Sequence, residues 1–264
     1  MILRETIIIS APNNCYADKN IYFCIVMLYL YRIYQCVIML PVMLVATVIT
    51  ALIAIVGSML GAGKWCGYWP EVVWARMWCL LAFVRVRVRG RENISSSTSY
   101  VFVANHQSAY DIFSVYGYLG HSFRWMMKQE LRKIPLVGLA CEKSGQIYVD
   151  RSSPSAIRHT MERAEKLLSG GMSIVVFPEG ARTWDGKMRR FKRGAFALAT
   201  EFGLPVVPLT IDGAFAVMPR TATLPHWGTI TLTIHKPIFP PAQGYDLPGL
   251  MEQSRDVIAS ALPE

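Results

Sequence analysis

The sequence predicts an α/β fold, in which helices cover both faces of a sheet, with an N-terminal membrane-embedded helical element. Over the C-terminal two thirds, short apolar segments alternate with longer helix-length segments. Apolar strands between helices are typical of a sheet that is buried on both faces. Before that part, 31 consecutive residues, Ile33–Gly63, carry no formal charge. We therefore expect membrane-anchoring helices over residues 1–83 and an α/β domain over residues 84–264.

The charge-free run is long enough to cross a bilayer. A span needs about 20 apolar residues, and 31 residues would form about 46 Å of helix. We therefore expect tilt or a bend, for which Pro41 is the candidate. The alternative is a long helix buried in a soluble core. The first 26 residues show no clear period, and Met27 is a candidate start that would make them an upstream extension.

Two segments link this run to the rest of the chain. Trp65–Phe83 is helix-length and rich in Trp, which favours the membrane–water interface over an ordinary core helix. Val84–Gly90 (VRVRVRG) alternates strictly and predicts a strand. Its arginines form a basic stripe suited to lipid headgroups, or they keep an edge strand soluble.

Composition excludes several classes of protein. Hydrophobic residues make up 53% of the chain and charged residues 17%, which excludes intrinsic disorder. The net charge of +9 suits anionic lipids or phosphorylated substrates, and no recognisable motif supports DNA binding. Basic residues follow the apolar run, so the C-terminal domain is expected on the cytoplasmic side. No His/Cys cluster has the spacing of metal ligands, so we expect no metal.

The remaining elements follow from the same patterns. Expected strands are Tyr100–Ala104, Phe123–Met127, Gln146–Val149, Ser173–Phe177, Pro205–Ile211 and Thr229–His235. Expected helices are Ala109–Leu119, Pro154–Leu168, Gly194–Phe202 and Pro248–Leu262.

His106 and Asp111 lie where the strand Tyr100–Ala104 gives way to a helix. Ligands bind at the carboxyl ends of strands in α/β sheets. A carboxylate beside an imidazole makes a general base, because Asp fixes the tautomer while His accepts a proton. However, Ser108-Ala-Tyr-Asp111 is also a capping-box pattern. On this motif alone, catalysis and capping are equally supported.

A second strand, Ser173–Phe177, ends in Pro-Glu-Gly-Ala-Arg. Pro178 cannot continue a central ladder, and Gly180 allows close approach of the backbone to a ligand. Glu179 and Arg182 are thereby placed at the edge of the sheet. An ordinary turn at the end of a strand is the alternative.

A third strand leads from Gly145 to Asp150-Arg151. The Arg151 guanidinium can hold a phosphate bidentately, or pair with Asp150 as a minor surface bridge. Downstream lies a basic loop that is either an anion site or simply solvated. Its charged residues are Lys187, Arg189, Arg190, Lys192 and Arg193.

Together these motifs resemble the glycerolipid acyltransferase family of phospholipid synthesis, specifically its 1-acyl-glycerol-3-phosphate acyltransferases. The family's H-x-x-x-x-D block matches His106 and Asp111, and its G-x-x-[FY]-[IV]-x-R block matches Gly145 to Arg151. The F-P-E-G-T-R block matches Phe177 to Arg182, and the proline-containing strand block matches Val207–Ile211. Lys128-Gln-Glu-Leu also looks like family sequence. Ala181 departs from the family's usual Thr.

The resemblance implies a mixed, mostly parallel sheet and a defined reaction. A fatty acyl group passes from acyl-CoA or an acyl-carrier protein to the free hydroxyl of lysophosphatidic acid, giving phosphatidic acid, without a cofactor. His106 would be the base and Asp111 its orienting partner. Lys128, Arg151 and Arg182 would hold the phosphate, in a substrate site to which Gly145, Glu179 and Gly180 belong.

Two other readings stay open at this point. The acceptor could be glycerol-3-phosphate, lyso-ornithine lipid or another lysophospholipid. Alternatively, the chain is a non-catalytic protein that binds membrane surfaces.

Overall fold

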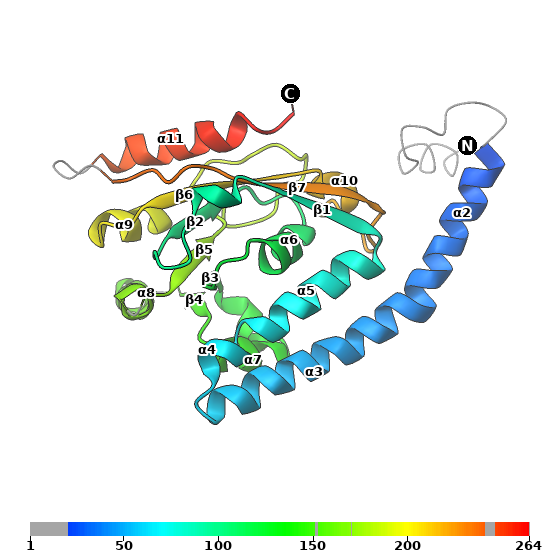
Figure 1. The fold of residues 1–264 in the computed structure, drawn as a ribbon, viewed down its shortest axis with the longest axis horizontal. Helices are drawn as coiled ribbons and strands as arrows, with labels where there is room; N and C mark the ends of the chain where they lie inside the picture. Colours follow the sequence, from blue (N-terminus) through cyan, green and yellow to red (C-terminus); the bar gives the residue numbers. More distant parts are fainter. Residues whose placement is uncertain (1–20, 151–152, 170, 241–245, 264) are drawn as a thin grey trace. The chain divides into compact units, whose positions relative to one another are not determined.

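A computed structural model describes residues 21–150, 153–169, 171–240 and 246–263. It contains a seven-stranded sheet in the order β1-β7-β6-β2-β5-β3-β4 (Figure 1). All neighbouring strands run parallel except β6 and β7. The predicted mixed, mostly parallel sheet is therefore confirmed. The strands are β1 (Val84–Arg89), β2 (Val101–Ala104), β3 (Phe123–Lys128), β4 (Ile147–Val149), β5 (Ser173–Val176), β6 (Val206–Asp212) and β7 (Gly228–Ile234).

Helices cover both faces of the sheet. On one face α5 and α6 pack against β1, and α6 also packs against β7. On the other face Val101 and Val103 join a core cluster with side chains from α8, α9 and α11. The bounds are α5 (Trp69–Leu81), α6 (Tyr110–Tyr118), α8 (Pro154–Ser169), α9 (Gly194–Glu201) and α11 (Leu247–Ala259). All four residues of β2 are apolar and buried, so the strand is covered on both faces of the sheet, as the sequence predicts.

The chain divides into two compact units between Val45 and Ala46. A continuous helical stretch, Tyr22–Met59, is long and apolar enough to cross a membrane by length and composition. Its most apolar window is only 17% buried, which does not fit the alternative of a buried core helix. Residues 1–20, which include most of the possible upstream extension, lie outside the described residues. The predicted border between residues 83 and 84 falls between α5 and β1 and stays a prediction.

Pro41 marks an irregular turn in this helix. The stretch consists of α2 (Ile21–Tyr34), a π-helical turn η1 (Gln35–Met39) and α3 (Leu40–Met59). Pro41 has no N–H, and its ring interferes with the carbonyl one turn earlier. The π turn next to it is a recognised response to such a defect. The irregularity therefore lies where the sequence predicts a bend.

The predicted helix Trp65–Phe83 is two helices in the structure, α4 (Gly63–Cys66) and α5. The break lies just before Pro70, which suits the first turn of a new helix. Val72, Ala75 and Cys79 of α5 are buried, whereas Trp69 and Val73 are exposed. The helix thus has both a core face and an exposed apolar face.

The sequence analysis did not predict several short helices. These are η3 (Gln129–Lys133), α7 (Val137–Lys143) and α10 (Ala214–Val217), besides the single turn η2 (Arg91–Asn93). A segment of four to seven residues is too short for hydrophobic periodicity to show itself. β1 is an edge strand with exposed Arg85, Arg87 and Arg89, as its alternation predicts.

Candidate active site

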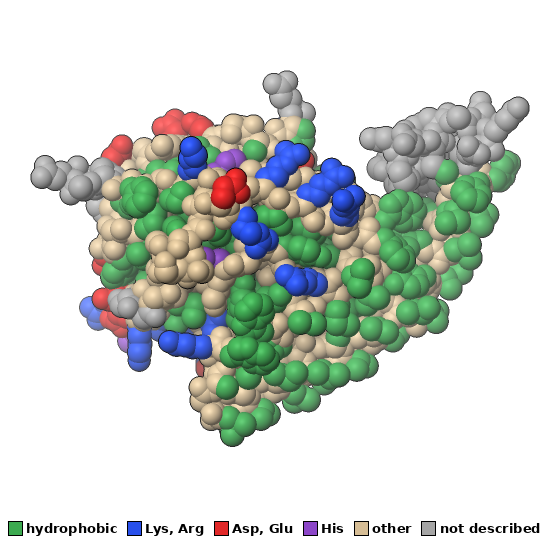
Figure 2. All heavy atoms as spheres, in the orientation of Figure 1, with side chains coloured by type: hydrophobic (Ala, Val, Ile, Leu, Met, Phe, Trp, Pro, Cys, Tyr) green, Lys and Arg blue, Asp and Glu red, His purple; other side chains and the backbone are tan. Residues whose placement is uncertain are grey.

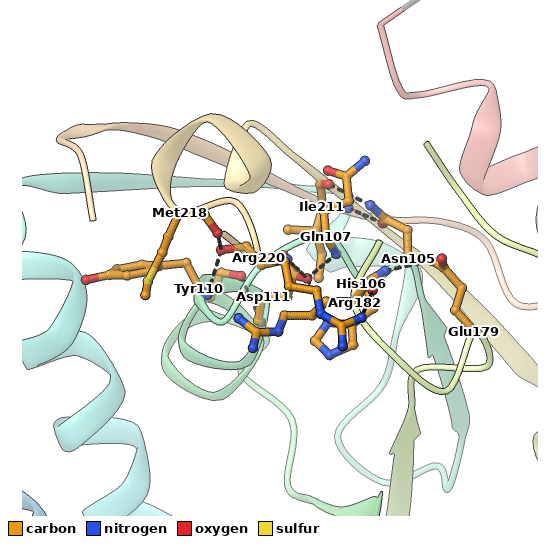
Figure 3. Close-up of polar contacts among 12 residues, drawn as sticks. Asn105, His106, Gln107, Tyr110, Asp111, Glu179, Arg182, Ile211, Met218 and Arg220 are labelled. Atoms are coloured by element: carbon orange, nitrogen blue, oxygen red, sulfur yellow. Dashed lines mark hydrogen bonds and ion pairs between the residues drawn. The ribbon is translucent and has the colours of Figure 1, made fainter. Parts of the chain in front are cut away.

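The site lies where β6, β2 and β5 end side by side. These three strands are adjacent and parallel, so their carboxyl ends meet at one edge of the sheet. The buried amide of Asn105, the first residue after β2, receives the N–H of Ile211 and donates to its C=O, both at 2.8 Å. This double contact fixes the start of the loop to β6 (Figure 3). The sequence analysis missed Asn105, although an amide directly after an apolar strand was a usable signal.

His106 and Asp111 form a pair. The Asp111 carboxylate is fully buried, and its Oδ2 lies 2.9 Å from His106 Nδ1. The same oxygen accepts the N–H groups of Gln107, at 2.6 Å, and Ser108, at 2.8 Å. Asp111 lies in the first turn of α6, where the helix dipole also favours a negative charge.

The two interpretations of this motif therefore coexist. Asp111 accepts the N–H of Ser108 at 2.8 Å, which is one half of a capping box, whereas Ser108 Oγ accepts the N–H of Tyr110, at 3.1 Å, and not that of Asp111. The cap orients the carboxylate that contacts His106. Capping and pairing are properties of one side chain here.

The imidazole of His106 has a fixed orientation. Its ring stacks on Phe177, with ring centroids 3.9 Å apart and an interplanar angle of 8°. With Nδ1–H donated to Asp111, a neutral imidazole has its lone pair on Nε2. Because His106 lines the cavity described below, this lone pair is available to a bound hydroxyl.

Glu179 supports the same loop from the opposite side. Its side chain is buried and accepts the N–H of His106 and the N–H of Arg189, both at 2.8 Å. Burial raises the pKa of Glu179 to about 7, and the charge of Asp111 adds to this rise while the two N–H groups oppose it. Glu179 therefore positions the His106 backbone as well as shaping the pocket.

Further hydrogen bonds join the loop after β5 to its neighbours. The N–H of Thr183 donates to the C=O of His106 at 3.0 Å, and Gln107 Nε2 donates to the C=O of Gly186 at 2.6 Å. Arg220, between α10 and β7, donates from Nη1 to the C=O of Arg182 at 2.9 Å. Its guanidinium also lies 4.0 Å from the ring centroid of Trp184. Figure 3 shows Arg182 and Arg220 beside His106.

A cavity of about 1610 Å³ extends from His106. Five predicted site residues line it, namely His106, Lys128, Glu179, Gly180 and Arg182, as does Ala181. Asp111 is buried behind the histidine. Further cations on its wall are Lys133, Arg189, Arg190, Lys192, Arg193 and Arg220. The basic loop thus contributes to the cavity, and Lys133 and Arg220 were missed because they lie outside the motifs.

The rest of the cavity wall is mostly apolar. It is formed by residues of α3, α5, α6 and α7, namely Thr47, Thr50, Ala51, Trp74, Ile112, Tyr116, Val137 and Ala140. One cavity therefore combines an imidazole, a cationic wall and an apolar wall. That combination fits a ligand with an anionic head and a hydrocarbon chain.

One predicted residue, Gly145, is placed away from the cavity. Gly145 has φ +84° and closes the turn after α7, where its N–H donates to the C=O of Glu142 at 3.2 Å. It does not line the cavity. Arg151 lies outside the described residues. Within the described residues, no three His, Cys, Asp or Glu side chains are grouped so that they could hold a metal ion.

Comparison with known proteins places the chain in a family. Residues 85–212 match the family model described as Acyltransferase. A chloroplastic 1-acyl-sn-glycerol-3-phosphate acyltransferase of Brassica napus is 34% identical over 193 residues, which are 71% of this chain and 55% of that protein. The chain contains a domain of the acyltransferase family.

Other acyltransferases give the same result. The human 1-acyl-sn-glycerol-3-phosphate acyltransferase alpha is 40% identical over 130 residues, which are 49% of this chain and 46% of that protein. The crystal structure of the 1-acyl-sn-glycerophosphate acyltransferase of Thermotoga maritima matches with a TM-score of 0.72 and 27% identity, over 89% of this chain and 93% of that one. The chain spans about half the length of the first curated relatives. The segment that matches the acyltransferase model contains His106, Asp111, Glu179 and Arg182.

The raised pKa of Glu179 predicts a pH dependence of stability. A carboxyl whose pKa is about 7 when folded and 4.5 when unfolded favours folding below pH 4.5. That contribution is lost as the pH rises through 7, and amounts to about 3 kcal/mol. Substitution Glu179→Gln removes the titrating group. Urea unfolding in detergent at pH 5 and pH 8 should therefore show a smaller pH-dependent loss in this variant than in wild type. Equal losses in both proteins would contradict the assigned pKa.

Proposed function

We propose that the protein transfers a fatty acyl group from a thioester to the free hydroxyl of 1-acyl-glycerol-3-phosphate and so forms phosphatidic acid. The thioester is acyl-CoA or an acyl-carrier protein. The observation that carries this proposal is the His106–Asp111 pair in a cavity with both a cationic and an apolar wall. The named relatives support the same acceptor.

The chemistry follows from the free Nε2 of His106. The acceptor hydroxyl gives its proton to Nε2 while its oxygen attacks the thioester carbonyl carbon, and Asp111 stabilises the imidazolium that forms. The tetrahedral intermediate then expels the thiolate as the C–S bond breaks. The thiolate takes the proton from Nε2. The products are an ester and a free thiol, and the step needs no metal or other cofactor.

The cationic wall gives the acceptor its orientation. Lys128, Arg151 and Arg182 hold the phosphate in this proposal, while Glu179 and Gly180 shape the loop around it. Gly180 has φ +76°, and a Cβ there would lie 2.6 Å from Lys192 Nζ. The loop therefore needs glycine to bring that ammonium close. Gly145 acts through the turn that precedes β4 and Arg151.

The apolar helix supports a membrane location. Residues 1–83 serve as the anchor and residues 84–264 as the catalytic domain, which faces the cytoplasm according to the basic residues after the apolar run. Its partners are then membrane lipids, lysophosphatidic acid and the acyl donor. Both the acceptor and the product partition into the bilayer, so an anchored enzyme meets its substrate at the membrane surface.

The decisive test uses purified protein, labelled acyl-CoA or acyl-carrier protein, and a panel of acceptors separated by lipid chromatography. We expect labelled phosphatidic acid from 1-acyl-glycerol-3-phosphate. Transfer only to glycerol-3-phosphate, lyso-ornithine lipid or another lysophospholipid would overturn the proposed acceptor.

Replacing His106 by Ala should reduce the rate of transfer by about 10²- to 10⁴-fold, because a positioned base contributes on that scale. Membrane association should not change. His159→Ala is the matched control, since His159 is exposed on α8 and, among the described residues, pairs only with Glu162 of its own helix. Retention of more than about a tenth of the wild-type rate in His106→Ala would refute the role of the base.

Arg151→Ala and Arg220→Gln should chiefly raise KM for the phosphorylated acceptor. Arg151 is assigned to the phosphate, and Arg220 holds the backbone of Arg182 in place. Lysine at position 220 keeps the charge but loses the planar guanidinium, which donates to the C=O of Arg182 and stacks on Trp184 at the same time. We therefore expect Arg220→Lys to recover only part of the loss. An unchanged KM in Arg151→Ala would move the phosphate site elsewhere.

A further inference from the structure

We propose that η3 and α7, together with the connection Ile134–Leu136, form a second membrane contact that borders the opening of the cavity. We call Gln129–Lys143 the η3–α7 segment. The inference rests on the proposed transfer to a bilayer lipid. In this proposal the lipid reaches the cavity past residues that lie outside the long apolar helix.

The segment exposes a group of large apolar side chains. Leu131, Ile134 and Leu139 are 41%, 43% and 47% exposed, although they lie within nine residues of one another. Leu131 and Ile134 also line the cavity. A side chain that is both exposed and part of the wall marks an opening. This opening is therefore bordered by apolar groups.

The other side of the segment is fixed to the protein. Leu136 and Ala140 pack with Ala51 and Ala54 of α3, and Tyr148 donates its hydroxyl to the C=O of Gly138 at 2.9 Å. In Figure 1, α7 lies beside the C-terminal part of α3. Residues 46–59 of α3 lie in the same compact unit as the segment and belong to the apolar stretch that we assign to the membrane. The segment therefore packs directly against part of that stretch.

Two local contacts hold the apolar side chains in this arrangement. Arg132 of η3 forms a bidentate ion pair with Glu142 of α7, at 2.6 Å and 3.0 Å. Leu136 has φ +63°, and Val137 N–H donates to the C=O of Pro135 at 2.6 Å. This is a γ-turn of the rare, strained type, which persists only where its surroundings determine it.

Charge selects an anionic lipid surface as the occupant. Lys128 and Lys133 line the opening, and neither ammonium has a hydrogen bond or ion pair with another described residue. Cations beside exposed leucine and isoleucine are typical of a segment at the headgroup level, with the apolar side chains below it. A protein partner would not explain why the apolar side chains also line a lipid-sized cavity.

The test compares a membrane-embedded acceptor with a soluble one. Leu139 faces outward and does not line the cavity, so Leu139→Asp leaves the cavity wall unchanged. With long-chain 1-acyl-glycerol-3-phosphate in vesicles of phosphatidylcholine and phosphatidylglycerol, we expect KM to rise about tenfold, equivalent to about 1.4 kcal/mol. With a monomeric hexanoyl acceptor, KM should stay within about twofold, which also shows that the variant is folded. Ile157→Asp on α8 is the matched control, because Ile157 is 46% exposed.

A second measurement does not depend on activity. A benzophenone amino acid at position 139 should crosslink to vesicle lipid several times more than the same group at position 157. Equal lipid crosslinking at the two positions, capture of a protein instead of lipid, or equal vesicle KM in both Asp variants would each overturn the proposed contact. If wild type transfers to neither acceptor, the proposed function fails, while the crosslinks still report on the membrane contact.

Discussion

The carboxylate of Asp111 is the interaction on which the site depends. One oxygen accepts hydrogen bonds from the imidazole of His106 and from two backbone N–H groups, while the other has no hydrogen-bond partner among the described residues. Three donors on one buried oxygen fix the loop, the start of α6 and the ring together. The three donors and the N-terminus of α6 take the place of water around this buried oxygen.

A second buried carboxylate completes the support of the histidine loop. Glu179 receives the N–H of His106 from the loop after β5, and the charge of Asp111 contributes to its raised pKa. Asp111 orients the ring, whereas Glu179 holds the backbone. Asp111 reaches the histidine from the first turn of α6, and Glu179 reaches it from the loop after β5.

The sequence predicts the regular part of this fold well, for a physical reason. β2, β5 and β6 are largely apolar on both faces, so their short apolar runs and their place between helices identify them without knowledge of tertiary contacts. The His106–Asp111 pair is also predictable. His106 follows the end of a strand and Asp111, five positions later, lies in the first turn of a helix, so the chain turns back and brings the two side chains together. Arg220 and Lys133 are not predictable in this way. They reach the cavity through a loop and a short helix whose course is set by contacts across the fold.

The interpretation of α5 shows the same limit. Its tryptophans favour the membrane interface, yet Val72, Ala75 and Cys79 are buried against the domain. Composition alone does not divide a helix into its two faces, because the position of its neighbours decides which side is covered. The break before Pro70, by contrast, follows from a local rule that applies to any helix start.

The most direct test of the account is the transfer rate of Asp111→Asn. Asparagine keeps an oxygen that can accept the N–H groups of Gln107 and Ser108, but it removes the charge that stabilises the imidazolium. If Asp111 served only as a helix cap, Asp111→Asn would therefore be stable and fully active. Our account predicts that the variant folds, as measured by thermal unfolding, and transfers acyl groups about 10²- to 10⁴-fold more slowly. A wild-type rate in a folded Asp111→Asn protein would contradict it.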